Sequence, residues 1–160
     1  MSARRRGASR DGKVRGVSAE PAPKPLPVPD QLSEEFWRAA ASHVLAVQRC
    51  VACGWFTHPP DVICVNCLSP ERAFRFDPVS GRGRVRSWTV MHDAFLPGFR
   101  PDVPYVVVDV ELDEQEGLRM VGQLVGGSAD GLALGAAAEV VFDDVAEGRA
   151  VPRFRLVAGA

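Results

Sequence analysis

Four cysteines in two close pairs constrain the fold of this 160-residue chain more than any other feature. They follow the pattern Cys50-x2-Cys53-x10-Cys64-x2-Cys67. Two such pairs can direct four thiolates to one tetrahedral metal ion, and Gly54 supplies the backbone freedom that the first turn needs. The pattern therefore predicts a small zinc ribbon over residues 48–76, with zinc held by all four cysteines.

A site with four thiolate ligands has no open coordination position. We therefore expect the zinc to stabilise the ribbon and not to activate water. Tetrahedral sulfur also suits iron, so the ligands alone leave zinc and iron open. Disulfides are the other common use of four cysteines, but they are rare in reducing compartments.

The predicted compartment is the cytoplasm. The segment Met1–Arg15 is basic but lacks the apolar core and cleavage site of a secretory signal. No run of eighteen apolar residues occurs anywhere in the chain, so we expect no membrane-spanning helix and no membrane partner.

The near-neutral net charge of -1 hides two oppositely charged parts. Residues 1–30 contain seven basic and three acidic residues, whereas residues 31–160 contain twelve basic and seventeen acidic ones and no lysine. Prolines occupy every second position from Pro21 to Pro29, which favours an extended spacer over a helix or a strand. We expect residues 1–30 to form a disordered basic arm, whose role the sequence does not indicate.

A helix is predicted over residues 33–46, within a segment that we delimit as 31–47. Ser33 precedes two glutamates, as expected for an N-cap followed by an acidic first turn. One apolar stripe runs at helical spacing through Phe36, Ala40, Val44 and Val47. Phe36 and Trp37 would either pack on the rest of the fold or anchor a partner subunit.

The rest of the chain is β-rich. Five short runs alternate between apolar and polar residues and are bounded by Gly, Pro and Asp: Arg84–Val90, Tyr105–Leu112, Leu118–Val125, Glu139–Phe142 and Arg153–Val157. Five strands without intervening helices predict a small barrel or sandwich over residues 77–160. The predicted fold class is mainly β, with an N-terminal helix, a rubredoxin-like ribbon and a five-stranded OB-fold barrel.

The thirteen-residue loop from His92 to Pro104 is too apolar for an idle solvent loop. It either caps the barrel or binds a ligand or partner, and the sequence favours neither alternative. The candidate contact residues in and beside it are Trp88, His92, Phe95, Phe99 and Arg100. No nucleophile elbow, phosphate-binding loop or convincing pair of carboxylates occurs, so we predict no catalytic residue in this chain.

These features together resemble a known family, the acyl-CoA-associated zinc-ribbon/OB-fold proteins long classed as a domain of unknown function. The matching motifs are Phe36-Trp37, Gln48-Arg49-Cys50, Cys53-Gly54, His58-Pro59-Pro60, Cys64 to Cys67, Ser80-Gly81-Arg82-Gly83, Val103-Pro104-Tyr105 and Val141-Phe142-Asp143-Asp144. They span residues 36–144; the basic arm lies outside the family pattern.

The resemblance implies a non-catalytic subunit that pairs with a thiolase-superfamily enzyme, either a thiolase or a retro-aldolase, or with a hot-dog-fold enoyl-CoA hydratase. Such a subunit would share an acyl-CoA ligand with its partner, and relatives of this kind act in steroid side-chain degradation. We expect a hetero-oligomer with two copies of each chain. The acyl chain, the partner's reaction and the stoichiometry stay open.

The main alternative is a protein that binds single-stranded nucleic acid, since ribbons and OB-folds both occur in that class. Residues 31–160 have a net charge of -5, whereas a nucleic-acid groove needs a basic track. The exception is a local arginine stripe at Arg82, Arg84 and Arg86, which could equally meet a CoA phosphate or a partner's carboxylates. We therefore expect no nucleic-acid partner.

Overall fold

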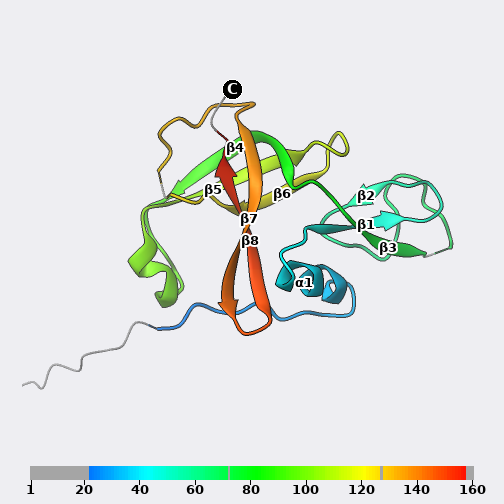
Figure 1. Ribbon diagram of the computed structural model, residues 1–160, viewed down its shortest axis with the longest axis horizontal. Coiled ribbons are helices and arrows are strands. Elements are labelled where there is room, and N and C mark those ends of the chain that lie inside the picture. Colours follow the sequence, from blue (N-terminus) through cyan, green and yellow to red (C-terminus); the bar gives the residue numbers. More distant parts are fainter. Residues whose placement is uncertain (1–21, 72, 127, 158–160) are drawn as a thin grey trace, which may run out of the picture.

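A computed structural model describes residues 22–71, 73–126 and 128–157 (Figure 1). The elements in chain order are α1 (Glu34–Ala41), β1 (Ala46–Cys50), β2 (Phe56–Thr57), β3 (Phe74–Pro78), β4 (Arg82–Met91), the 3-10 helix η1 (Pro97–Asp102), β5 (Tyr105–Leu112), β6 (Arg119–Gln123), β7 (Ala137–Ala146) and β8 (Arg149–Leu156). The predicted mainly β fold is confirmed. None of the helices within these ranges is both long and apolar enough to cross a membrane.

The helix α1 is shorter than the predicted helix over 33–46. Phe36 and Ala40 are buried as expected, but the chain leaves the helix at Ser42 and turns at His43, which has a φ of 57°. Val44 is 39% exposed, and Val47 is buried in strand β1 instead. The helical spacing of apolar residues continues past Ala41 by coincidence. The chain there forms strand β1 instead, because pairing of β1 with β3 overrides the helical pattern.

Ser33 is the N-cap of α1 as predicted, but its side chain makes no capping hydrogen bond. Asp30 takes over this function: its Oδ1 accepts hydrogen bonds from the backbone N–H of Leu32 at 3.1 Å and of Ser33 at 2.8 Å. Its backbone carbonyl accepts from the N–H of Glu34 at 2.9 Å. Hydrogen bonds from Ser33, the side-chain one foremost, lower the pKa of the Asp30 carboxyl.

The ribbon is a three-stranded antiparallel sheet in the order β2-β1-β3. In Figure 1 it lies to one side of the barrel, next to α1. Strand β1 is central and nearly fully buried, and it carries Cys50 at its end. Between β1 and β3 the chain makes two turns that carry the remaining cysteines.

The barrel is a five-stranded sheet in the order β6-β5-β4-β7-β8. It closes where β6 meets β8 through a single parallel bridge between Leu124 and Phe154, so this seam has far fewer backbone hydrogen bonds than the other strand pairs. Gly122 permits the close approach at the seam, since a Cβ there would lie 3.0 Å from the Phe154 ring. The closed order confirms the predicted OB-fold barrel.

The predicted alternation in Tyr105–Leu112 is confirmed residue by residue, because the four inward residues Val106, Val108, Val110 and Leu112 are 0–2% exposed. Strand β7 extends well beyond the predicted Glu139–Phe142. It pairs with β8 along almost its whole length, out to Ala146 opposite Arg149. Backbone pairing in this long hairpin holds Asp143 and Asp144 in a strand without burying them.

The expected disordered arm is partly wrong: residues 22–30 pack along the barrel, whereas residues 1–21 lie outside the described residues. In Figure 1 the segment runs below η1 and past the end of the β7–β8 hairpin to α1. Lys24 forms an ion pair with Asp102 of η1 at 2.5 Å. Farther along, the Arg149 guanidinium donates a hydrogen bond to the Pro27 carbonyl at 3.1 Å.

The ribbon and the barrel share one hydrophobic core, in which Val47 of β1 lies with barrel residues such as Val85, and two further connections join them. The chain passes from β3 to β4 through only three residues, 79–81. In addition, the Gln115 amide in the β5–β6 connection bonds the backbone of Phe56 in β2 twice: it accepts from the N–H at 2.8 Å and donates to the carbonyl at 3.0 Å. This side chain therefore pairs with the edge of the ribbon as a neighbouring strand would.

We expect Gln115→Leu to lower the free energy of unfolding by about 1–3 kcal/mol, because it leaves the partly buried N–H and C=O of Phe56 without partners. Chemical denaturation measures the change. The matched control is Gln123→Leu on β6, whose side chain makes none of the hydrogen bonds found among the described residues. A loss for Gln115→Leu no larger than that of the control would contradict this function of Gln115.

Candidate functional site

The four cysteine sulfurs lie within 4.8 Å of one another at the end of the ribbon. The Sγ atoms of Cys50 and Cys67 are 3.8 Å apart, and those of Cys53 and Cys64 are 3.6 Å apart. Tetrahedral zinc with bonds of about 2.3 Å places its sulfurs about 3.8 Å apart. The separations are far too long for disulfides, which need about 2.05 Å, and they fit a four-thiolate metal centre.

The two cysteine pairs sit in matching turns. The N–H of Gly54 donates to the Cys50 carbonyl at 2.9 Å, and the N–H of Leu68 donates to the Cys64 carbonyl at 2.9 Å. Both residues that follow the pairs have positive φ, 77° at Gly54 and 51° at Leu68. The glycine was predicted from the sequence, whereas the leucine in the second turn carries no such signal.

Two neighbouring side chains hold these turns in place. The Arg49 guanidinium donates to the Gly54 carbonyl at 2.9 Å and pairs with Asp77 at 3.1 Å. The Gln48 amide, 4% exposed, donates to the Asp61 carbonyl at 2.9 Å and accepts from the Asp61 N–H at 2.8 Å. Adjacent residues of β1 thus stabilise the first turn and the approach to the second.

The local environment gives the exposed cysteines opposite protonation behaviour. A hydrogen bond from the backbone N–H of Trp55, aided by the Asn66 amide, lowers the pKa of Cys53 to about 6. At Cys67 the Ser69 N–H acts in the same direction, but desolvation and the other three sulfurs outweigh it and raise its pKa to about 12. The Cys53 thiolate thus forms readily, and its negative charge disfavours deprotonation of the neighbouring thiols. A bound divalent cation would stabilise all four thiolates.

The predicted contact residues occupy different environments. Phe36 is only 5% exposed, and its ring packs on Trp37 at 5.0 Å and on His58 at 5.3 Å. The alternative that Phe36 packs on the fold therefore holds, and a surface function for its side chain does not fit this burial.

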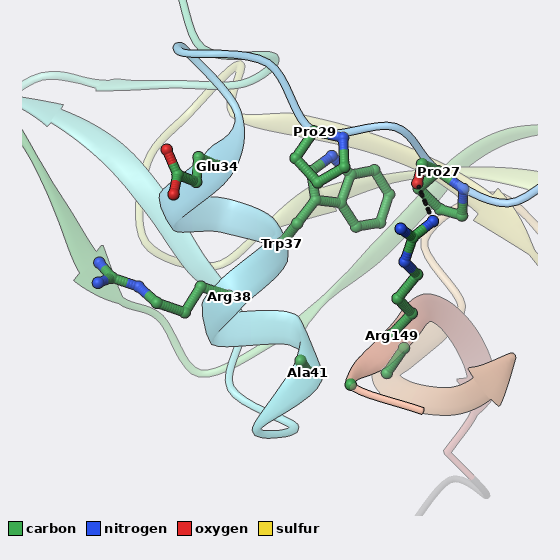
Figure 2. A pocket seen from close by; sticks show the side chains of 9 residues that line it. Pro27, Pro29, Glu34, Trp37, Arg38, Ala41 and Arg149 are labelled. Carbon is green, nitrogen blue, oxygen red and sulfur yellow. Dashed lines mark hydrogen bonds between the residues drawn. The ribbon is translucent and has the colours of Figure 1, made fainter. Parts of the chain in front are cut away.

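Trp37 is partly exposed and lines a shallow hollow of about 290 Å³ between α1 and the β7–β8 hairpin. Figure 2 shows its indole beside the Pro29 ring, with the Arg149 side chain reaching past it to Pro27. Glu34 and Arg38 of α1 also line the hollow, with their charged ends turned away from the indole. The proline segment of the chain itself thus lies against the Trp37 indole.

The loop from His92 to Pro104 is ordered around η1 and still presents an apolar surface. Ala94 is 5% exposed, whereas the adjacent Phe95 is 93% exposed. Phe99 is half-buried, with the Lys24 ammonium 5.4 Å from its ring centre. His92 and Arg100 are exposed, and Trp88 on the preceding strand is 38% exposed. The structure thus places four predicted residues at an accessible surface, with Phe99 partly covered.

Two family models match the chain. The model described as "ChsH2, rubredoxin-like zinc ribbon domain" matches residues 37–71, and "ChsH2, C-terminal OB-fold domain" matches residues 77–143. The chain is also 31% identical over 121 residues to a "DUF35 domain-containing scaffold protein" of Methanocaldococcus jannaschii. That similarity covers 74% of this chain and 82% of the relative. The chain belongs to the DUF35 family.

Other proteins similar to this chain carry enzyme names. A solved chain described as "Ltp2-ChsH2(DUF35) aldolase" matches with a TM-score of 0.70 and 32% identity, over 81% of this chain and 98% of that chain. The chain is 33% identical over 140 residues, 78% of its length, to "3-oxo-4,17-pregnadiene-20-carboxyl-CoA hydratase alpha subunit" of Mycobacterium tuberculosis. It spans only 33% and 42% of the two curated hydratase alpha subunits that it matches.

In this DUF35 protein the sequence pointed to the four metal ligands but not to the groups that orient them. Gln48 and Arg49 were noted only as part of a family motif. Nothing in their spacing predicted that their side chains would form hydrogen bonds that stabilise the cysteine turns. Gln115 carried no signal at all, because its partner Phe56 lies 59 residues away.

Substituting Cys50→Ser is expected to remove the bound metal and unfold the ribbon, because about thirty residues bury too little apolar surface to fold alone. Metal content per chain and circular dichroism measure the two effects. The matched control is Val51→Ser, a neighbouring side chain that is 57% exposed and should keep its metal. Full metal content in Cys50→Ser would contradict a four-cysteine centre.

The buried ring of His58 predicts a specific pH dependence of stability. Burial lowers its pKa to about 4 from an ordinary value of 6.5, so the unfolded chain takes up a proton first as the pH falls. The neutral ring therefore makes its full contribution to the free energy of unfolding above pH 6.5. This contribution declines by up to about 3 kcal/mol as the pH falls from 6.5 to 4.

Denaturation of wild type and His58→Phe at several pH values measures this contribution. The difference in unfolding free energy between them should shift in favour of the variant as the pH falls through that window. The exposed His92→Phe provides the control and should track wild type. Parallel pH profiles for wild type and His58→Phe would contradict a neutral buried ring.

Proposed function

We propose that this DUF35 chain is a non-catalytic subunit that binds a thiolase-superfamily enzyme, a thiolase or a retro-aldolase, and helps to position an acyl-CoA substrate. The observation that carries this proposal is the match to the solved chain described as "Ltp2-ChsH2(DUF35) aldolase", which this chain covers over 98% of its length. The four-thiolate centre agrees with it, because a closed metal site serves structure and leaves the chemistry to another chain.

The surface proposed for the partner is the loop around Phe95, together with Trp88, His92 and Arg100. Phe95 projects almost completely into solvent while its neighbour Ala94 anchors the loop. Large exposed aromatic side chains on an anchored loop mark interaction sites, and they often dominate the binding free energy. Phe99, partly covered by Lys24, would contribute at the rim of this surface.

A second arrangement is favoured by the hydratase names of two relatives. In those proteins a segment similar to this chain forms only 33% and 42% of the whole length. A hot-dog-fold hydratase is therefore the alternative partner for this chain, with steroid-derived acyl-CoA as one candidate substrate class.

The arginines of the barrel do not favour nucleic-acid binding. Arg119 pairs with Asp109, Arg153 with Asp143 and Arg155 with Glu139, and Arg86 lies 3.6 Å from Glu111. Within the described residues these cations are neutralised inside the chain, so they offer no continuous track for phosphates. The predicted stripe of Arg82, Arg84 and Arg86 is exposed, and this last pair neutralises its Arg86 end.

Co-expression with a thiolase-superfamily subunit from the same source tests the proposal. Light scattering after size exclusion is expected to show a stable hetero-oligomer with two copies of each chain. The complex should persist at high salt, because an apolar interface is little screened, whereas phosphate contacts would be lost. Two separate monomeric species, or stable association with single-stranded DNA instead, would refute the proposal.

Replacing Phe95 with Asp is expected to weaken the complex at least tenfold, since a central aromatic contact contributes about 2 kcal/mol or more. Isothermal titration of the purified chains measures the dissociation constant. Leu134→Asp is the matched control, because Leu134 is 73% exposed and lies outside the proposed surface. Equal affinities for the two variants would remove the Phe95 loop from the interface.

A further inference from the structure

A second accessible hollow lies on the outer face of the barrel, at the seam between β6 and β8. Its volume is about 660 Å³, within the range of about 300–1,000 Å³ of small-molecule sites. Its floor is formed by outward side chains of β5 and β6, including Val107 and Val121, and by Val151 of β8. None of these residues belongs to the metal centre or to the Phe95 surface.

The proline segment of residues 23–26 forms one wall of this groove. On one side the segment is anchored to η1, where Gly98 lets the backbones meet: a Cβ there would lie 2.6 Å from the Pro23 carbonyl oxygen. The ion pair of Lys24 with Asp102 adds to this anchor. On the other side, the hydrogen bond from Arg149 to Pro27 fixes the segment to the β7–β8 hairpin. The wall is therefore attached at both ends.

Each charged side chain that lines the groove has an ion-pair or hydrogen-bond partner within the chain. Lys24 pairs with Asp102 and Arg153 pairs with Asp143. Asp144 lies 2.8 Å from the His43 imidazole. An ionic ligand would have to break one of these pairs to gain a partner, which offsets what it gains. The apolar floor and the aromatic pair of Phe99 and Tyr105, with ring centres 6.2 Å apart, impose no such cost.

We propose that this groove binds a neutral, predominantly apolar small molecule. The size of the groove, its apolar floor, the fixed wall and the internally paired charges all favour an uncharged ligand. Binding here is independent of the proposed function, since the groove lies wholly within this chain and needs no partner subunit. Pre-formed walls lower the ordering cost of binding, so a simple chain of about ten carbons suffices as a probe.

The test compares decan-1-ol with decanoate on the full-length, metal-loaded chain by amide NMR. Decan-1-ol is expected to give saturable shifts at Val107, Val121 and Gly122, with an affinity at least tenfold higher than that of decanoate. Equal or tighter binding of decanoate would overturn the proposal. Shifts spread over the whole protein, or no saturable shift at these residues, would also overturn it.

A variant pair localises the binding. Val121 is 67% exposed, so Val121→Asp should fold normally while it places an unpaired charge in the groove. It is expected to weaken decan-1-ol binding at least tenfold. The control Leu134→Asp introduces the same charge at another exposed apolar site, 73% exposed and outside both surfaces, and should bind as wild type does. An unchanged affinity in Val121→Asp, or an equal loss in both variants, would place the ligand elsewhere and refute the groove as the site.

Discussion

The convergence of four sulfurs within 4.8 Å is the constraint on which the ribbon depends. Strand β2 has only two residues and pairs with β1 at two positions, so backbone pairing alone holds this edge of the ribbon poorly. The metal ligands come from the first turn, which begins at Cys50 at the end of β1, and from the second turn, and they hold these two segments together. Arg49 fixes the first turn and Gln48 the approach to the second through their hydrogen bonds to Gly54 and Asp61, which orient the cysteine ligands.

Charge pairing within the chain has an equally general effect on the barrel. Arg119, Arg153 and Arg155 pair with carboxylates on neighbouring strands, so these charged positions of the sequence are not free to bind a polyanion. What stays available for recognition is apolar: the loop around Phe95 and the groove over Val121. These surfaces suit protein contact and uncharged ligands better than they suit a polyanion.

The sequence predicted those features that depend on local pattern. Cysteine spacing located the metal ligands, and strict alternation located β5 to the residue. Pattern failed where distant pairing overrides local preference: Val47 continues a helical spacing but lies in a strand because β3 pairs with it. The alternating pattern also ended too early in β7, because pairing in the β7–β8 hairpin keeps Asp143 and Asp144 in the strand. The contacts of the proline segment could not be predicted either, because its partners Asp102 and Arg149 are distant in the sequence.

The two connections between ribbon and barrel have a mechanical consequence. A covalent link alone would leave the ribbon able to swing. The shared core around Val47 holds the ribbon against the barrel, and the Gln115 amide adds a fixed point on β2, so the angle between the two units is set. Glu114 stiffens the linker itself, because its carboxylate accepts a hydrogen bond from the Ser80 N–H at 2.6 Å. A protein that touches both units at once would therefore meet a rigid template, and little orientational entropy would be lost in aligning the ribbon with the barrel.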